Sequence, residues 1–127
     1  MFDELPDKVK QGLKAFNQGN FYAAHDYFED AWRATRHPNR EFYRALLHLS
    51  GGYYRLTQNR PGAAQKFFQR SLHWLGHFPS PYFDIDVFAL KNHVQKLINC
   101  IQSGQTSSSL LTNNRYQIPY PNQETSS

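Results

Sequence analysis

The chain has 127 residues and a mass of 14.9 kDa, is 39% hydrophobic and 16% aromatic, and carries a formal net charge of +4. This length predicts a single domain, and the composition excludes a disordered chain, which would be less apolar and less aromatic. No stretch is apolar over the roughly 18 residues that a membrane span needs, and the N-terminal residues lack the apolar core of a signal peptide. Cys100 has no second cysteine with which to form a disulfide bond. We therefore expect a soluble cytoplasmic protein.

Apolar residues recur at helical spacing along the sequence, and no convincing strand alternation is present. The first predicted helix covers residues 6–17 and the second 21–36, with Gly19 as a left-handed cap and Asn20 as an N-cap between them. The third covers 40–58, after a proline that ends the second. The fourth starts near Pro61 and ends near 77, and the fifth runs from 84 or 86 to 104.

The third helix is predicted to be central, because apolar residues cover a wide arc of its surface. Its Ser50, Gly51 and Gly52 lower helix propensity, so we expect a neighbouring helix to approach closely there. When the sequence is shifted by 40 residues, the turn at 19–24 aligns with the turn at 59–64. This repeated helix–turn–helix pattern resembles tetratricopeptide-type hairpins. The expected fold is all-α: a compact bundle of about five antiparallel helices with tetratricopeptide-like hairpins.

We assign residues 1–104 to a single helical-bundle domain and residues 105–127 to a polar, mostly disordered C-terminal tail. The tail contains one apolar, proline-stiffened stretch at 116–121, which we expect to dock on the bundle as an extended strap.

The second predicted helix carries the strongest candidate site. At 100° per residue, four side chains fall within about 60° of arc beside the apolar stripe: His25, Glu29, Trp32 and Arg36. Polar groups at the edge of a core need partners. The strip is therefore a structural cluster, a ligand pocket, or a catalytic or metal-binding pair.

The third helix adds basic residues to this candidate pocket. Arg44, His48 and Arg55 share the face that carries the two glycines, and a positive pocket follows if that face meets the second helix. In the structural interpretation, Glu29 hydrogen-bonds to His25 and pairs with Arg36 or Arg44. The candidate ligand-binding residues are His25, Glu29, Trp32, Arg36, Arg44 and His48. No residue set completes a metal site unambiguously, so we assign no metal and no cofactor.

Residues 21–33 resemble the signature F-x-x-A-H-x-x-x-E-x-x-W of a small family catalogued as domain of unknown function number three hundred and nine. The resemblance continues through residues 42–54 and 59–63 and covers roughly residues 10–100. It implies an all-helical bundle with a shared pocket around His25, Glu29 and Trp32, and it implies no established activity. His48 stands where members often carry glutamine, and Asp26 replaces a usual glutamate.

Charge is unevenly distributed: residues 1–30 contain three lysines and six acidic residues, whereas residues 31–70 contain eight basic residues and one acidic residue. Pairing of the two regions within one fold explains this, and an anionic partner is the alternative. We favour a non-enzymatic module that binds a protein segment or a small anionic ligand. A hydrolase or metal-dependent enzyme using His25 and Glu29 is the alternative. Nucleic-acid binding ranks last because no recognition fold is evident, and homo-oligomerisation stays open.

Overall fold

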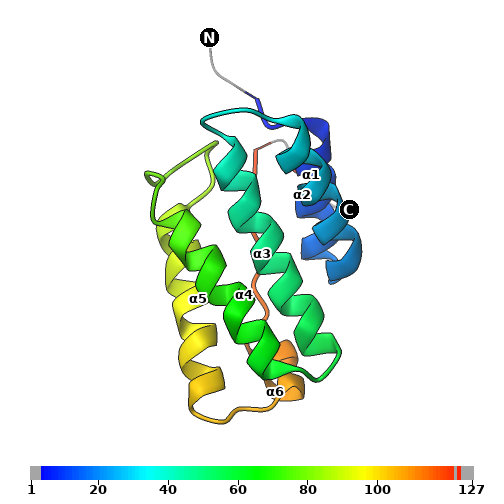
Figure 1. Ribbon diagram of the computed structural model, residues 1–127, viewed down its shortest axis with the longest axis vertical. Helices are drawn as coiled ribbons and strands as arrows, with labels where there is room; N and C mark the ends of the chain where they lie inside the picture. The colour runs from blue at the N-terminus through cyan, green and yellow to red at the C-terminus, as the bar shows by residue number, and fades with distance from the viewer. Residues whose placement is uncertain (1–3, 122, 124–127) are drawn as a thin grey trace.

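The computed structural model describes residues 4–121 and 123, and within them the protein is an all-α bundle (Figure 1). Its helices are α1 (Asp7–Asn17), α2 (Phe21–Ala34), α3 (Arg40–Thr57), α4 (Pro61–Leu75), α5 (Val87–Gln102) and α6 (Ser107–Asn113). From α1 to α5, each helix packs against the next one along the chain, and α6 packs against α3. The predicted all-α class is confirmed, with six helices in place of about five.

Most helix boundaries follow the turn residues in the sequence. Gly19 has a φ of +84°, and the Asn20 side chain accepts a hydrogen bond of 3.2 Å from the amide of Ala23 at the start of α2. Pro61 occupies the first turn of α4, where its missing N–H costs no helical hydrogen bond. Asp86 caps α5 through the amide of Ala89, at 2.9 Å. These caps confirm the predicted helix starts, whereas α2 and α4 each end two residues earlier than expected.

The centre of the bundle is α3, whose two glycines let α4 approach it. A Cβ atom on Gly52 would lie 2.4 Å from the Phe68 ring, and one on Gly51 would lie 3.1 Å from the Phe67 ring. Both distances are shorter than ordinary carbon contacts, so only glycine fits here without a shift of the neighbouring ring. The predicted close approach at these glycines is therefore confirmed.

Aromatic rings fill the core around one fully buried tyrosine of α3. The Tyr53 ring contacts three other buried rings edge-on or stacked, with centroids 4.8–5.6 Å away: Phe16, Phe21 and Phe68. Its hydroxyl donates to the backbone carbonyl of Asn114 at 3.1 Å and lies 2.6 Å from Nε2 of His93. Because a phenol has one proton, His93 donates from Nε2 to the Tyr53 oxygen in this arrangement.

The segment predicted as a mostly disordered tail is ordered over much of its length. Residues 107–113 form α6, which begins with a side-chain cap from Thr106, and residues 114–121 form an extended strap. Ile118 is buried at 1% exposure, and the ring of Tyr116 stacks on His93 with centroids 4.6 Å apart. The structure contains the strap expected at residues 116–121, and it forms a helix over residues 107–113, within the segment expected to be mostly disordered. Residues 122 and 124–127 lie outside the described residues.

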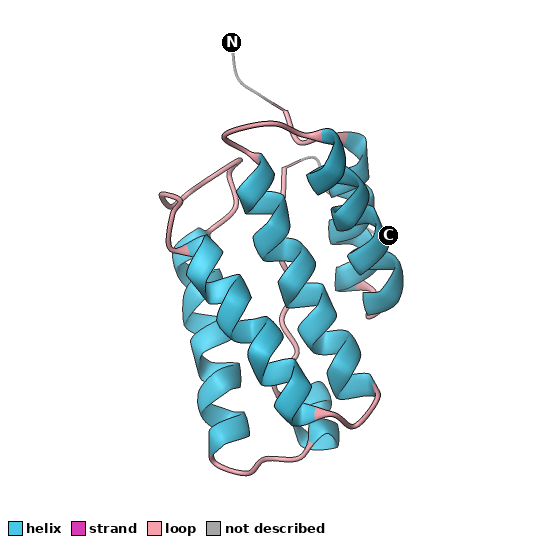
Figure 2. Ribbon diagram, viewed as in Figure 1, coloured by secondary structure: helices cyan, strands magenta, loops and turns pink. Residues whose placement is uncertain are grey.

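The strap leaves one side of the central helix free of tail residues. In Figure 1 it runs behind α3, on the side away from the viewer, while α2 and α4 flank α3 on the near side. Figure 2 shows that the connections between these helices are loops at the two ends of the bundle. The surface formed by α2, α3 and α4 on the near side is called the α2–α3–α4 face below. It carries the candidate site.

Candidate functional site

The partly exposed residues of α3 define the floor of the α2–α3–α4 face. Most of this helix is buried, and the side chains that keep partial exposure are Arg40, Glu41, Arg44, His48, Tyr54 and Arg55. Gly51 lies in line with them and is covered by the side chains of Phe67 and His25. Four of these residues recur at three- and four-residue intervals, so they form one stripe along the helix: Arg44, His48, Gly51 and Arg55.

A pocket of about 170 Å³ opens at one end of this stripe. Its walls come from all three helices, and its lining residues are Tyr22, His25, Gly51, Tyr54, Arg55 and Phe67. The Arg55 guanidinium lies 5.4 Å from the Phe67 ring centroid and 5.7 Å from that of Tyr54. No acidic residue lines the pocket, so its charged group is a cation. We call this site the tyrosine pocket.

At the other end, aromatic and basic side chains alternate across the face. The Arg44 guanidinium lies 5.6 Å from the Trp32 ring of α2 and 4.6 Å from the Trp74 ring of α4. Arg40 contacts Trp32 at 4.4 Å. Cation–π contacts of this kind fix the orientation of a guanidinium and contribute roughly 0.5–1 kcal/mol each at exposed sites. We call these four residues the tryptophan–arginine ladder.

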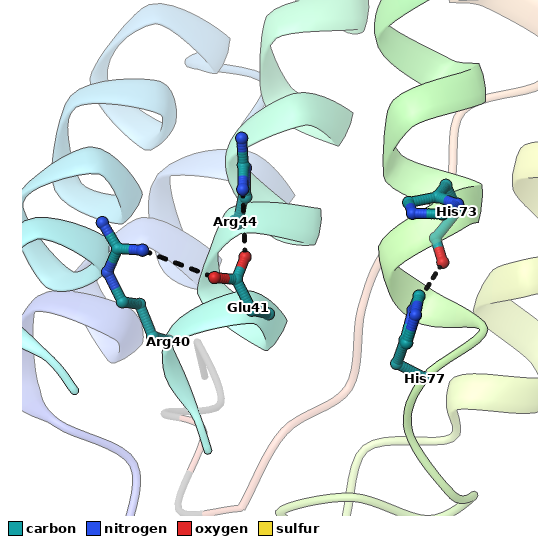
Figure 3. Close-up of polar contacts among 5 residues, drawn as sticks. All are labelled: Arg40, Glu41, Arg44, His73 and His77. Carbon is teal, nitrogen blue, oxygen red and sulfur yellow. Dashed lines mark hydrogen bonds and ion pairs between the residues drawn. The ribbon is translucent and has the colours of Figure 1, made fainter. Parts of the chain in front are cut away.

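Glu41 ties the two arginines of the ladder together. Its carboxylate oxygens lie 3.4 Å from Nη1 of Arg40 and 3.3 Å from Nη1 of Arg44, as Figure 3 shows. One carboxylate therefore faces two guanidinium groups, and a positive charge remains at this end of the face. Each arginine side chain keeps more than a third of its surface exposed, so both retain donors for a ligand.

His25 and Glu29 are close in space but do not form the expected hydrogen bond. Nδ1 of His25 lies 4.0 Å from Glu29 Oε2 and 3.5 Å from Asp26 Oδ1. The other Glu29 oxygen, Oε1, pairs with Nη2 of Arg33 at 2.8 Å. The expected pairing of Glu29 with Arg36 or Arg44 is wrong, because one turn of helix brings Arg33 to the carboxylate first.

His48 lies between the two ends of the face and is half-buried. Burial lowers its pKa to about 4, and the positive charges of Arg44 and Arg70 act in the same direction. Its ring lies 6.0 Å from the Phe67 ring. The Nδ1 atom of His48 and the Nε1 atom of Trp32 are both buried without a hydrogen-bond partner. Two polar groups on this face therefore have unused hydrogen-bonding capacity.

Of the six predicted site residues, the α2–α3–α4 face brings five together. Arg36 is the exception: it is exposed beyond the end of α2, whereas Glu29 and His48, which also lie outside the pocket lining and the ladder, are partly buried. The sequence analysis missed several lining residues of the face, namely Tyr22, Arg40, Tyr54, Phe67 and Trp74. To find them, one would need to know which faces of α3 and α4 meet. The 40-residue repeat indicates which helices pair, but it does not specify those faces.

Two exposed histidines, His73 in the last turn of α4 and His77 just after it, lie beside Trp74 of the ladder, with ring centroids 5.0 and 5.4 Å from it. Nδ1 of His77 lies 3.0 Å from the backbone oxygen of His73, so this ring interacts with the helix end (Figure 3). Within residues 4–121, no group of three or more histidine, cysteine, aspartate or glutamate side chains is placed to hold a metal ion. No helix among the described residues is long and apolar enough to cross a membrane.

Comparison with known proteins connects this geometry to a family. The model of the family described as "Domain of unknown function (DUF309)" matches residues 9–67, which include α2, α3 and the start of α4. The resemblance expected over roughly residues 10–100 is thus confirmed for the part that lies within residues 9–67. In addition, a protein of Aquifex aeolicus (strain VF5), described as an uncharacterized protein, is 20% identical over 97 residues. These residues are 76% of this chain and 29% of the relative, so the chain spans less than a third of that protein's length.

The DUF309 match and the candidate site overlap along the chain. His25, Glu29 and Trp32 of α2, together with Arg44 and His48 of α3, all lie within residues 9–67. Trp74, which completes the ladder, lies beyond the matched range. Neither the description of the family nor that of the relative states an activity. The residues of the face themselves indicate its chemistry.

Proposed function

We propose that the protein is a non-enzymatic binding module and that the α2–α3–α4 face holds an anionic ligand. The observation that carries the proposal is the placement of Arg44 between the rings of Trp32 and Trp74. A guanidinium held between two aromatic rings loses little further freedom when it binds, and its planar donors match the oxygens of a carboxylate or phosphate.

The charge of the surrounding face supports the same ligand class. Arg40 and Arg44 share the single carboxylate of Glu41, and the tyrosine pocket contains Arg55 without an acidic neighbour in its lining. Arg70 adds a further cation near the pocket, 5.7 Å from the ring of Phe67. An anion on this face would meet more positive than negative groups, which favours association and partner selectivity.

A hydrolase that uses His25 and Glu29 receives less support. A carboxylate that orients a general base hydrogen-bonds to it, and the distance of 4.0 Å from His25 Nδ1 to Glu29 Oε2 is too long for a hydrogen bond. Glu29 is also engaged by Arg33 at 2.8 Å. His25 is a lining residue of the tyrosine pocket, where its ring nitrogens can hydrogen-bond to a ligand.

Tryptophan fluorescence provides a direct test, because the two tryptophans of the chain, Trp32 and Trp74, both contact Arg44. Titration with inorganic phosphate should change the emission in a saturable way, with sodium chloride at equal ionic strength as the reference. Arg44→Gln should weaken phosphate binding by about tenfold, the effect of losing one charge-assisted hydrogen bond. Lys96→Gln on the exposed surface of α5 is the charge-matched control and should bind as the unmodified protein does. An emission change that follows only ionic strength would contradict the proposal.

A further inference from the structure

The two cationic ends of the α2–α3–α4 face are separated by a defined distance. Arg44 and Arg55 are eleven residues apart on α3, which places their backbone positions about 16 Å apart along the axis. Eleven steps of 100° bring the second side chain to within about 20° of the first, so both arginines lie along one line. A ligand that reaches both ends must therefore be long and run parallel to α3.

The tyrosine pocket is too small to hold such a ligand by itself. Its volume is about 170 Å³, whereas pockets for whole cofactors or drug-sized molecules are typically about 300–1,000 Å³. The pocket suits one side chain of a larger ligand. The remainder of that ligand would lie over His48 and reach the tryptophan–arginine ladder, which is formed by Trp32, Arg40, Arg44 and Trp74.

An extended peptide has the matching repeat. Its residues advance by about 3.3 Å, and alternate side chains point to the same side. Acidic side chains at positions i and i+4 therefore lie on one side and about 13 Å apart. The flexible arginine side chains can accommodate the difference from 16 Å. Two-residue spacing would not match, because acids at i and i+2 of an extended chain are only about 7 Å apart.

From this spacing we propose that the ligand is an extended acidic peptide segment of a partner protein, with one carboxylate on Arg44 and another, four residues away, on Arg55. This inference rests on the proposed anion-binding function and assigns its ligand class. The charge of the face complements two carboxylates, since Glu41 already neutralises one of the two ladder arginines. His48, whose buried Nδ1 has no hydrogen-bond partner, lies between the two ends, and the Nε1 atom of the ladder residue Trp32 is likewise buried and unpartnered.

Three synthetic five-residue peptides of nearly equal composition test the spacing. The first, acetyl-Glu-Ser-Pro-Ser-Glu-amide, has acids four residues apart and a proline that prevents a helix. The second, acetyl-Glu-Glu-Ser-Pro-Ser-amide, has the same composition with adjacent acids, and the third replaces the last glutamate of the first with glutamine. Binding to the full chain is measured by tryptophan emission and, for the pocket end, by the backbone NMR signal of Gly51.

The first peptide should bind at least tenfold more tightly than the second or the third. Arg44→Gln and Arg55→Gln should each reduce its affinity to that of the single-acid peptide, and Lys96→Gln should not change it. Equal affinity for the three peptides, with phosphate still bound, would overturn the peptide inference and leave the anion site standing. Absence of binding by both peptides and phosphate would overturn the proposed function as well. Tighter binding of an eight-nucleotide oligothymidylate than of any peptide would replace the peptide with a nucleic acid.

Discussion

The side chain of Asn17, the last residue of α1, hydrogen-bonds to both backbone polar groups of Ile118, which lies 101 residues later in the chain. Its Nδ2 donates to the Ile118 oxygen at 2.9 Å, and its Oδ1 accepts from the Ile118 nitrogen at 2.8 Å. The strap thus completes the hydrogen bonding of a buried asparagine and adds an apolar residue to the core. This pair joins the first helix to the strap at the side of α3 opposite the candidate site.

Replacement of Asn17 by alanine should destabilise the fold by about 2 kcal/mol, because both backbone groups of Ile118 would be left buried without partners. Urea unfolding followed by circular dichroism measures the loss. Asn99→Ala is the control, since Asn99 is an exposed residue of α5 and its replacement should cost less than about 0.5 kcal/mol. Equal stability of the two variants would show that the strap does not depend on this pair.

Replacing Gly52 and Gly62 by alanine should have opposite effects on stability, because the space around the two residues differs. Gly52→Ala should cost about 1–3 kcal/mol, because the new methyl group would lie 2.4 Å from the buried ring of Phe68. Gly62→Ala should leave stability unchanged or raise it by up to about 1 kcal/mol, because no atom lies within 4 Å and alanine favours the helix. Thermal unfolding of both variants checks the order. A tolerated Gly52→Ala would mean that α3 and α4 are not in close contact there.

The stability of the protein should fall between pH 6.5 and pH 4. Burial lowers the pKa of both His48 and His93 to about 4 in the folded chain, against 6.5 for an ordinary histidine. In this window the unfolded chain binds more protons than the folded one, so acidification favours unfolding. Each histidine should contribute about 1–2 kcal/mol of the loss between pH 7 and pH 5.

Urea unfolding of the His93→Gln variant at pH 7 and pH 5 tests this assignment. The variant should lose less stability on acidification than the unmodified protein, because one of the two histidines with a lowered pKa has been removed. Besides burial, which is the larger cause, the positive charge of Lys96 lowers the pKa of His93. An unchanged pH dependence in the variant would contradict the assignment to His93.

Glu29 and Trp32 should differ in their contributions to stability. Glu29→Gln should cost less than about 1 kcal/mol, because the carboxylate pairs with Arg33, whose side chain is 68% exposed. Trp32→Ala should cost about 2–4 kcal/mol through lost packing and lost contacts with Arg40 and Arg44. Chemical denaturation measures both. A loss of several kcal/mol for Glu29→Gln would indicate a structural role for the His25–Glu29 pair that the observed distances do not support.

The positions and starts of the first five helices could be predicted from the sequence because local chemistry determines them. The left-handed cap at Gly19, the side-chain cap at Asn20 and the first-turn proline at Pro61 act within a few residues of the chain. The strap was also predictable, since its apolar residues stand out in a polar tail. α6 was missed because its sequence, SSSLLTN, has low helix propensity, and its stability comes from the burial of Leu110 against the bundle.

The candidate site could be predicted only in part. The wheel of α2 correctly groups His25, Glu29 and Trp32 at the edge of the core, because their order on one helix is a local property. The partners across helices depend on how α2 and α4 are rotated about α3, which the sequence pattern does not specify. That rotation brings Trp74 to Arg44, a contact that does not follow from spacing alone, whereas the pairing of Glu29 with Arg33 is a local i,i+4 contact within α2.

The most direct test of the central claim is an NMR titration of the ¹⁵N-labelled chain with inorganic phosphate at constant ionic strength. The chain has two indole N–H groups, on Trp32 and Trp74, and both rings contact Arg44. Binding at the α2–α3–α4 face predicts that both indole signals shift along saturable curves. Arg44→Gln should weaken the phosphate affinity obtained from these curves about tenfold. Indole signals that stay in place while phosphate is added, or that move equally in the Arg44→Gln variant, would contradict the account.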